Sequence, residues 1–193
     1  MSEREVWIIE PSHTLLEFSA KHMMITNVRG RFNQFEGRIE LDPSNIENST
    51  VEGAVYTHSV DTNQGQRDDH LRSPDFFHAE EHPTMVFKST KVEHVHGNEY
   101  KVTGDLTIRG TTKPVTFKVT DEGRGTNPWG GQRWGLSAET KVNRKDWNLN
   151  LNAALETGGW LVGDDIRINA EIQAMSLAEY EAAQARAAQV VAA

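Results

Sequence analysis

The chain has 193 residues, a net charge of −8 at neutral pH and no cysteine. This length favours a single domain with a full hydrophobic core. The negative charge argues against general binding to nucleic acid or to anionic lipid surfaces, because both need a basic field, and the lack of cysteine excludes disulfides and thiol chemistry.

The N-terminus shows no secretory signal pattern. Glu3 and Glu5 stand where a signal peptide would carry positive charge, and no apolar run approaches the roughly 18 residues of a membrane span. We therefore expect a cytoplasmic protein; a periplasmic or secreted location is the less favoured alternative.

Apolar and polar residues alternate with a period of two through most of the chain, as in half-buried strands. The segments with this pattern are 15–22, 32–42, 51–61, 84–95, 100–110, 114–120, 134–142 and 166–173. They predict about eight or nine antiparallel strands separated by turns. Helices do not alternate with the strands, so a barrel or a sandwich is favoured over parallel α/β architecture.

Two segments predict helices instead. Residues 73–83 predict a short helix, because Ser73 can cap it, Pro74 suits its first turn and Pro83 follows its end. Residues 176–193 form an Ala-rich helical tail that begins with the capping box of Ser176 and Glu179. We place the barrel domain at 1–175 and the tail at 176–193, and expect a partly frayed surface helix, with a dimer contact as the alternative.

Histidines are the main candidates for chemistry. His70, His78 and His82 fall within thirteen residues, and His78 and His82 would share one helix face, as zinc ligands do. However, the chain has no H-E-x-x-H, no G-x-S-x-G and no phosphate-binding glycine loop. We predict no catalytic residue, no metal and no cofactor; a metal-dependent enzyme using the three histidines is the less favoured alternative.

Several ordered motifs resemble the YceI-like family of polyisoprenoid-binding or lipid-binding proteins, from about Trp7 to Ile172. They are "PSHTLLEFSAKHMMITNVRGRF", "SVDTNQGQRDDHLRSPDFFHAEEHPTMVFKS", "YKVTGDLTIRGTTKPVTF", "VNRKDWNLN" and "VGDDIRINAEIQ". The resemblance implies an all-β, antiparallel eight-stranded lipocalin-like barrel with a short lid helix, an interior for a long apolar chain, frequent dimers and no established catalytic apparatus. One departure is Asn148 after "RKDW", where the family usually has glycine, which predicts a different local turn.

The resemblance also assigns roles to the stretch after residue 65. It implies that Arg67, Asp68, His70 and Leu71 are fold residues at a closed barrel end, and that Phe76 and Phe77 supply apolar lid surface.

We predict that the protein binds and sequesters or carries a polyisoprenoid or an isoprenoid quinone inside the barrel. A stress-response interaction protein with a filled barrel is the alternative, and a homodimer is left open. Small residues interleave with large ones on the predicted inner faces, which favours a hollow interior, although plain core packing accounts for some of them. The predicted ligand-binding residues are Leu16, Phe18, Ala20, His22, Phe32, Phe35, Phe76, Phe77, Phe87, Gly104, Leu106, Ile108, Phe117, Leu136, Ala138 and Trp147.

Overall fold

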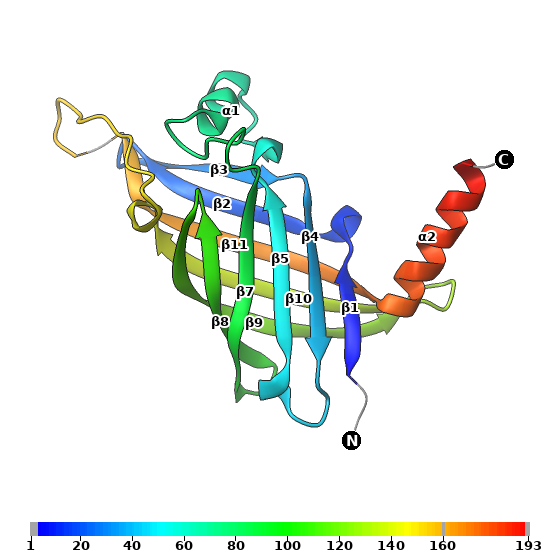
Figure 1. The fold of residues 1–193 in the computed structure, drawn as a ribbon. Helices are drawn as coiled ribbons and strands as arrows, with labels where there is room; N and C mark the ends of the chain where they lie inside the picture. The colour runs from blue at the N-terminus through cyan, green and yellow to red at the C-terminus, as the bar shows by residue number, and fades with distance from the viewer. Residues whose placement is uncertain (1–3, 160, 192–193) are drawn as a thin grey trace.

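A computed structural model describes residues 4–159 and 161–191, and shows a barrel of long antiparallel strands (Figure 1). The strands are β1 (Glu5–Ile9), β2 (Leu15–His22), β3 (Thr26–Phe32), β4 (Phe35–Leu41), β5 (Thr50–Tyr56), β6 (Val60–Asp61), β7 (Thr84–His96), β8 (Glu99–Ile108), β9 (Thr111–Thr126), β10 (Gln132–Asn143) and β11 (Val162–Ser176). The helices are α1 (Gly65–Arg72) and α2 (Leu177–Val191), with short 3-10 turns η1 (Pro11–His13), η2 (Ile46–Asn48), η3 (Thr57–Ser59) and η4 (Arg144–Trp147).

The barrel closes through β1. This strand pairs with β4 on one side and with the end of β11 on the other, where Trp7 faces Ser176 and Ile9 faces Ala174. The closed ring runs β1-β4-β5-β7-β8-β9-β10-β11, which is eight strands. The rest of β11 pairs with β2, and β3 and β6 follow β2. The predicted eight-stranded antiparallel barrel is therefore confirmed. Because the ring is closed, β1, β4 and β11 each pair with a neighbour on both sides within it.

The predicted lid helix is displaced along the chain. The helix is α1 at Gly65–Arg72, and residues 73–83 form a series of turns instead. The Gln64 side chain accepts a hydrogen bond from the backbone N–H of Arg67 and so caps the start of α1. Ser73 stands at the C-terminal cap, not the N-terminal one, and its N–H donates to the His70 carbonyl. Pro74 thus follows a helix end, because proline cannot continue the hydrogen-bond ladder.

Two clusters of buried side chains form the hydrophobic core of the barrel. One surrounds Trp147 and Phe32, and the other surrounds Trp7 and Trp134, whose rings meet edge-on at 5.5 Å. The guanidinium of Arg124 lies 4.9 Å from the centre of each of these two indole rings. Such cation–π contacts stabilise the outer side of the second cluster.

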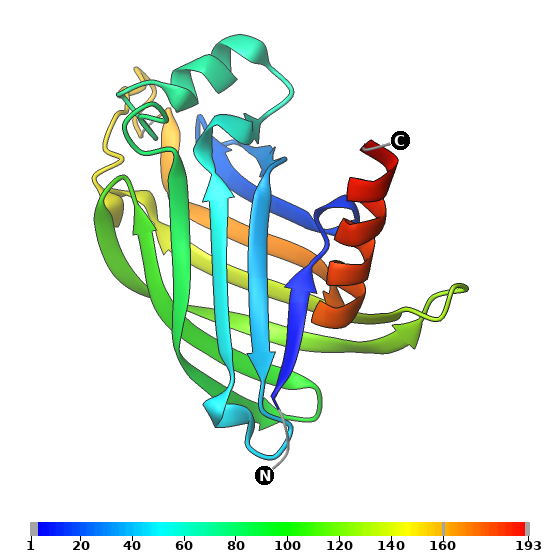
Figure 2. The ribbon, with the colours of Figure 1, turned by 45° about the vertical axis from the view of Figure 1, so that its right-hand side comes forward.

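The C-terminal helix stands beside the barrel. The Ser176 hydroxyl accepts from the Glu179 N–H at 3.4 Å, as in the predicted cap, and α2 projects away from the wall next to β1 (Figure 2). Residues 192 and 193 of the predicted tail lie outside the described residues. Within the described part of the chain, neither helix has the length and apolar character that crossing a bilayer requires.

Candidate functional site: an apolar cavity under a lid

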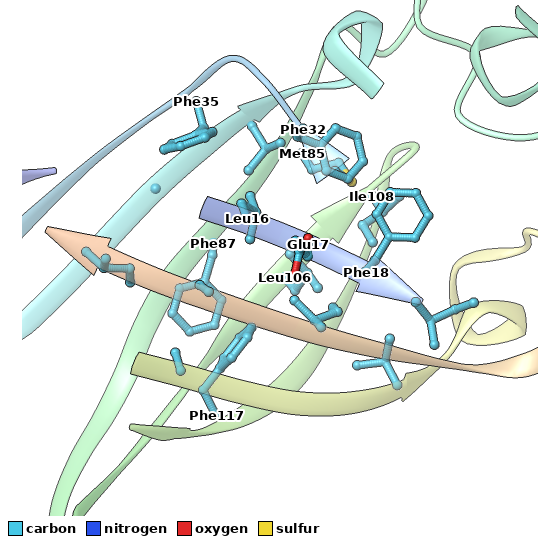
Figure 3. Close-up of a pocket in the computed structure, with 18 of the residues that line it drawn as sticks. Leu16, Glu17, Phe18, Phe32, Phe35, Met85, Phe87, Leu106, Ile108 and Phe117 are labelled. Atoms are coloured by element: carbon cyan, nitrogen blue, oxygen red, sulfur yellow. The ribbon is translucent and has the colours of Figure 1, made fainter. Parts of the chain in front are cut away.

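The barrel encloses a cavity of about 340 Å³. Apolar side chains from both walls dominate its lining, and Figure 3 shows Leu16, Phe18, Phe87 and Phe117 around one shared space. Period-two strands produce this arrangement, since alternate side chains of each strand point inward. A volume of this size falls in the range of ordinary small-molecule pockets.

The structure brings nearly all the predicted ligand-binding residues to this cavity. The residues that line it are Leu16, Phe18, Ala20, Phe32, Phe35, Phe76, Phe77, Phe87, Leu106, Ile108, Phe117, Leu136, Ala138 and Trp147. His22 and Gly104 are not among the lining residues. His22 pairs with Thr26 and Val162 at the end of β2. The role of the lining residues in binding stays a prediction.

Gly104 does not provide room for a ligand. A Cβ built on Gly104 would lie 2.5 Å from Cζ of Phe87 and would also meet the carbonyl oxygen of Lys88. The missing side chain therefore makes space for a neighbouring ring, which is a packing requirement.

The sequence did not predict several further residues that line the cavity. They include Val55, Met85, Val119, Val142, Leu149, Val162, Ile166, Ile168, Ala170 and Ile172. Four of them, Ile166, Ile168, Ala170 and Ile172, alternate along one face of the strand predicted at 166–173. The alternation could therefore have identified them as lining residues. Met85 lies at the start of β7, and Leu149 lies beyond the end of β10. At such positions the alternation does not show which side chains point inward.

The lid covers the cavity with aromatic side chains. The Phe77 ring meets Phe32 edge-on at 5.7 Å, and Phe32 in turn lies 5.4 Å from Phe18. The lid backbone is fastened on two sides, because Phe77 N–H donates to the Leu71 carbonyl and Nη1 of Arg109 donates to the Phe76 carbonyl. The assignment of Phe76 and Phe77 to lid surface agrees with this placement.

A buried polar network holds α1 against the barrel rim. Asp68 is 7% exposed and accepts hydrogen bonds from the N–H and the hydroxyl of Thr62, at 2.8 and 2.5 Å. Nε of Arg67 donates to the same hydroxyl at 2.7 Å. Both side chains are thus engaged in holding the segment in place.

The three histidines proposed for an enzyme do not converge. Nε2 of His70 lies 2.8 Å from Oδ2 of Asp75, and its ring meets Phe76. Within residues 4–159 and 161–191, His70 belongs to no cluster of potential metal ligands, whereas His78 and His82 do, together with Glu81. A site that combines all three histidines is therefore not formed.

Arg144 is the buried cation beside the cavity. It is 3% exposed, and its guanidinium donates to the carbonyls of Leu149, Leu151 and Gly163 and to Oδ1 of Asp164. Burial lowers the pKa of this guanidinium, and the Asp164 carboxylate opposes that shift. These bonds fix the loop between β10 and β11 under the cavity wall.

The turn next to Arg144 explains the asparagine at position 148. Asn148 adopts φ 60° and ψ 23°, the left-handed conformation that glycine takes freely and asparagine tolerates. Asparagine therefore suits this turn, and a difference from the turn of relatives stays a prediction. Within the turn, Nε1 of Trp147 donates to the Leu106 carbonyl at 2.9 Å.

These features define a closed antiparallel barrel with an apolar, lidded interior, and comparison with known proteins gives its family. The model of the YceI-like domain matches residues 7–174, so the chain belongs to the YceI-like family. A UPF0312 protein of Vibrio cholerae is 39% identical over 143 residues, covering 74% of this chain and 76% of the relative.

Two solved structures share the fold. A Campylobacter jejuni YceI protein is 31% identical with a TM-score of 0.68, covering 80% of this chain and 88% of that one. A polyisoprenoid-binding domain from Saccharophagus degradans has a TM-score of 0.61 at 10% identity, covering 90% of this chain and 99% of that one. At that identity the second likeness is one of fold.

Proposed function

We propose that this protein binds a long apolar lipid inside the barrel and sequesters or carries it. The observation that carries the proposal is the apolar lining of a lidded cavity of about 340 Å³. An apolar chain in water costs roughly 0.8 kcal/mol per exposed CH₂, and a closed apolar tube removes that cost without any catalytic group.

We propose a polyisoprenoid or an isoprenoid quinone as the ligand. The barrel of the same fold in Saccharophagus degradans is described as a polyisoprenoid-binding domain, which supports this class. Branched prenyl units also suit a wall that mixes aromatic rings with Ile, Leu and Val side chains. Specificity among apolar chains should be modest, because ordering the chain opposes binding and apolar side chains dominate the lining.

A chain-length series tests the proposal. Delipidated protein is titrated with prenyl alcohols of increasing length, and uptake is followed by tryptophan fluorescence, since Trp147 lines the cavity. Ala138→Phe should fill part of the cavity and reduce uptake of the longer chains. Glu139 is the next residue on β10 with a 62% exposed side chain, so Glu139→Phe is the matched control. Equal uptake by both variants, or no uptake by the parent, would contradict the proposal.

A further inference from the structure

The end of the lid segment forms one tight turn that gathers three side chains. The N–H of His82 donates to the His78 carbonyl at 2.8 Å, and the N–H of Glu81 donates to the same carbonyl at 3.1 Å. This turn, in which His78 has a φ of 50°, brings the side chains of residues 78, 81 and 82 close together.

The potential ligand atoms of these residues converge. Nδ1 of His78 lies 3.2 Å from Oε2 of Glu81, and Nε2 of His82 lies 3.8 Å from Oε1 of the same carboxylate. One ligand atom from each residue can be chosen so that all three lie within 4.8 Å of one another. Two ligands about 2.05 Å from a tetrahedral zinc ion stand roughly 3.3 Å apart, so small side-chain rotations bring the three atoms to that spacing.

We propose that His78, Glu81 and His82 bind a late first-row divalent metal ion, with Zn²⁺ as the representative, on the outer side of the lid. Two imidazoles and one carboxylate form a ligand set that zinc uses in proteins, with the fourth position left to water. The proposal does not depend on the lipid-binding function.

The sequence order supports the two histidine ligands. Residues 78–82 read H-A-E-E-H, which fits the H-x-x-E-H spacing of one class of zinc peptidases. In such motifs the two histidines bind the zinc ion and the glutamate acts as a general base, so the likeness concerns His78 and His82 alone. Glu81 is assigned as a ligand from its position beside both imidazoles.

The scaffold under the turn is rigidly held. Thr57 is 1% exposed; its hydroxyl donates to the His82 carbonyl at 2.8 Å and its N–H donates to the Pro83 carbonyl at 2.9 Å. Ligands on a turn fixed in this way lose less entropy when an ion binds.

The three side chains can also be reached from solvent. The His78 and His82 side chains are 26% and 27% exposed, and that of Glu81 is 66% exposed. A hydrated ion can therefore enter without opening the barrel.

A bound ion would affect the lid. Phe77 precedes His78 and lines the cavity, so an ion that joins residues 78 and 82 restrains the backbone next to this aromatic cover. The folded turn holds the ligands together and the unfolded chain does not, so the ion should stabilise the folded protein by mass action.

Calorimetric titration of the chelator-treated protein with Zn²⁺ tests the site. We expect one ion per chain, and at least ~10-fold weaker binding in His82→Ala, because removing even an outer partner of a metal ligand typically costs 10–100-fold. Glu81→Gln should also weaken binding and, being exposed, should leave the fold intact by circular dichroism. Co²⁺ in place of Zn²⁺ should give the visible absorption of a four-coordinate site in the parent.

Two histidine–carboxylate pairs elsewhere provide matched controls. His96 lies 3.3 Å from Glu99, and His70 lies 2.8 Å from Asp75. Neither His96→Ala nor His70→Ala should change the affinity for Zn²⁺. Absence of stoichiometric binding to the parent, or unchanged affinity in both His82→Ala and Glu81→Gln, would overturn the proposal.

Discussion

The ring of Phe87 on β7 occupies the space that a side chain at position 104 on β8 would need. A Cβ at Gly104 would stand 2.5 Å from Cζ of Phe87, a distance that real Cβ contacts do not reach. Because Gly104 has no side chain, the Phe87 ring can lie against β8, and Phe87 also lines the cavity.

Gly104→Ala should therefore destabilise the barrel by about 1–3 kcal/mol, because it overpacks the wall. Gly53→Ala is the control, since a Cβ there would meet only the Glu36 carbonyl oxygen at 3.5 Å. The control should be neutral, or stabilising by up to about 1 kcal/mol. Urea unfolding measures both, and equal losses of stability would refute the packing explanation.

Much of the fold follows from the alternation of apolar and polar residues. The segments 100–110 and 166–173 each predicted a strand and its apolar face. Leu106 and Ile108 of the first segment were predicted to bind the ligand and do line the cavity, whereas the lining residues of 166–173 were not predicted to do so. The alternation alone left a barrel and a sandwich open, because β1, the strand that closes the ring, is only five residues long; the barrel was predicted from the family resemblance.

The lid required information that local sequence does not contain. Ser73 and Pro74 suit a helix start, yet the Gln64 cap and the bonds of Asp68 to Thr62 place α1 eight residues earlier. Gly104 was included among the predicted ligand-binding residues, and the sequence could not show that the Phe87 ring of a neighbouring strand lies against it. Location and oligomeric state stay predictions.

Asp68 should be a major contributor to stability. Asp68→Ala removes the acceptor of both Thr62 hydrogen bonds, and bonds to a charged group contribute about 1.5–3 kcal/mol each, so a loss of several kcal/mol is expected. The neighbouring Asp69, 80% exposed, pairs with Arg72 at the surface, so Asp69→Ala should cost at most about 1 kcal/mol. Thermal unfolding of the two variants decides, and similar melting temperatures would show that the network is not important.

Arg144 should be far more sensitive than the lysine that follows it. Arg144→Ala leaves the carbonyls of Leu149, Leu151 and Gly163 without this donor and removes one of the two cationic partners of Asp164, for which about 3–5 kcal/mol is expected. Lys145 also pairs with Asp164, at 2.9 Å, but is 44% exposed, so Lys145→Ala should lose about 1 kcal/mol or less. Denaturant titration measures the difference, and the prediction fails if the two variants are equally stable.

Glu10 should make stability depend on pH. Burial raises the pKa of its carboxyl, but the hydrogen bond from Gln173 and the charges of Arg133 and His13 outweigh burial and hold the pKa below its ordinary value. A depressed pKa gives stability that is present above the unfolded value, about 4.3, and is lost as pH falls through the folded value.

Glu10→Gln should therefore be less stable than the parent at neutral pH, and the difference should shrink as pH falls below about 4. Urea unfolding at a series of pH values measures this difference, with the largely exposed Glu139→Gln as the control. A difference that stays constant down to the lowest pH would show that the Glu10 charge does not contribute.

Extraction of the purified protein tests lipid binding most directly. The protein is purified without added lipid, denatured and extracted with organic solvent, and the extract is analysed by mass spectrometry alongside that of Ala138→Phe. We expect a long apolar chain compound, prenyl in character, from the parent and less of it from the variant. A clean extract, together with failure of the parent to take up any prenyl quinone, would contradict the lipid-binding account.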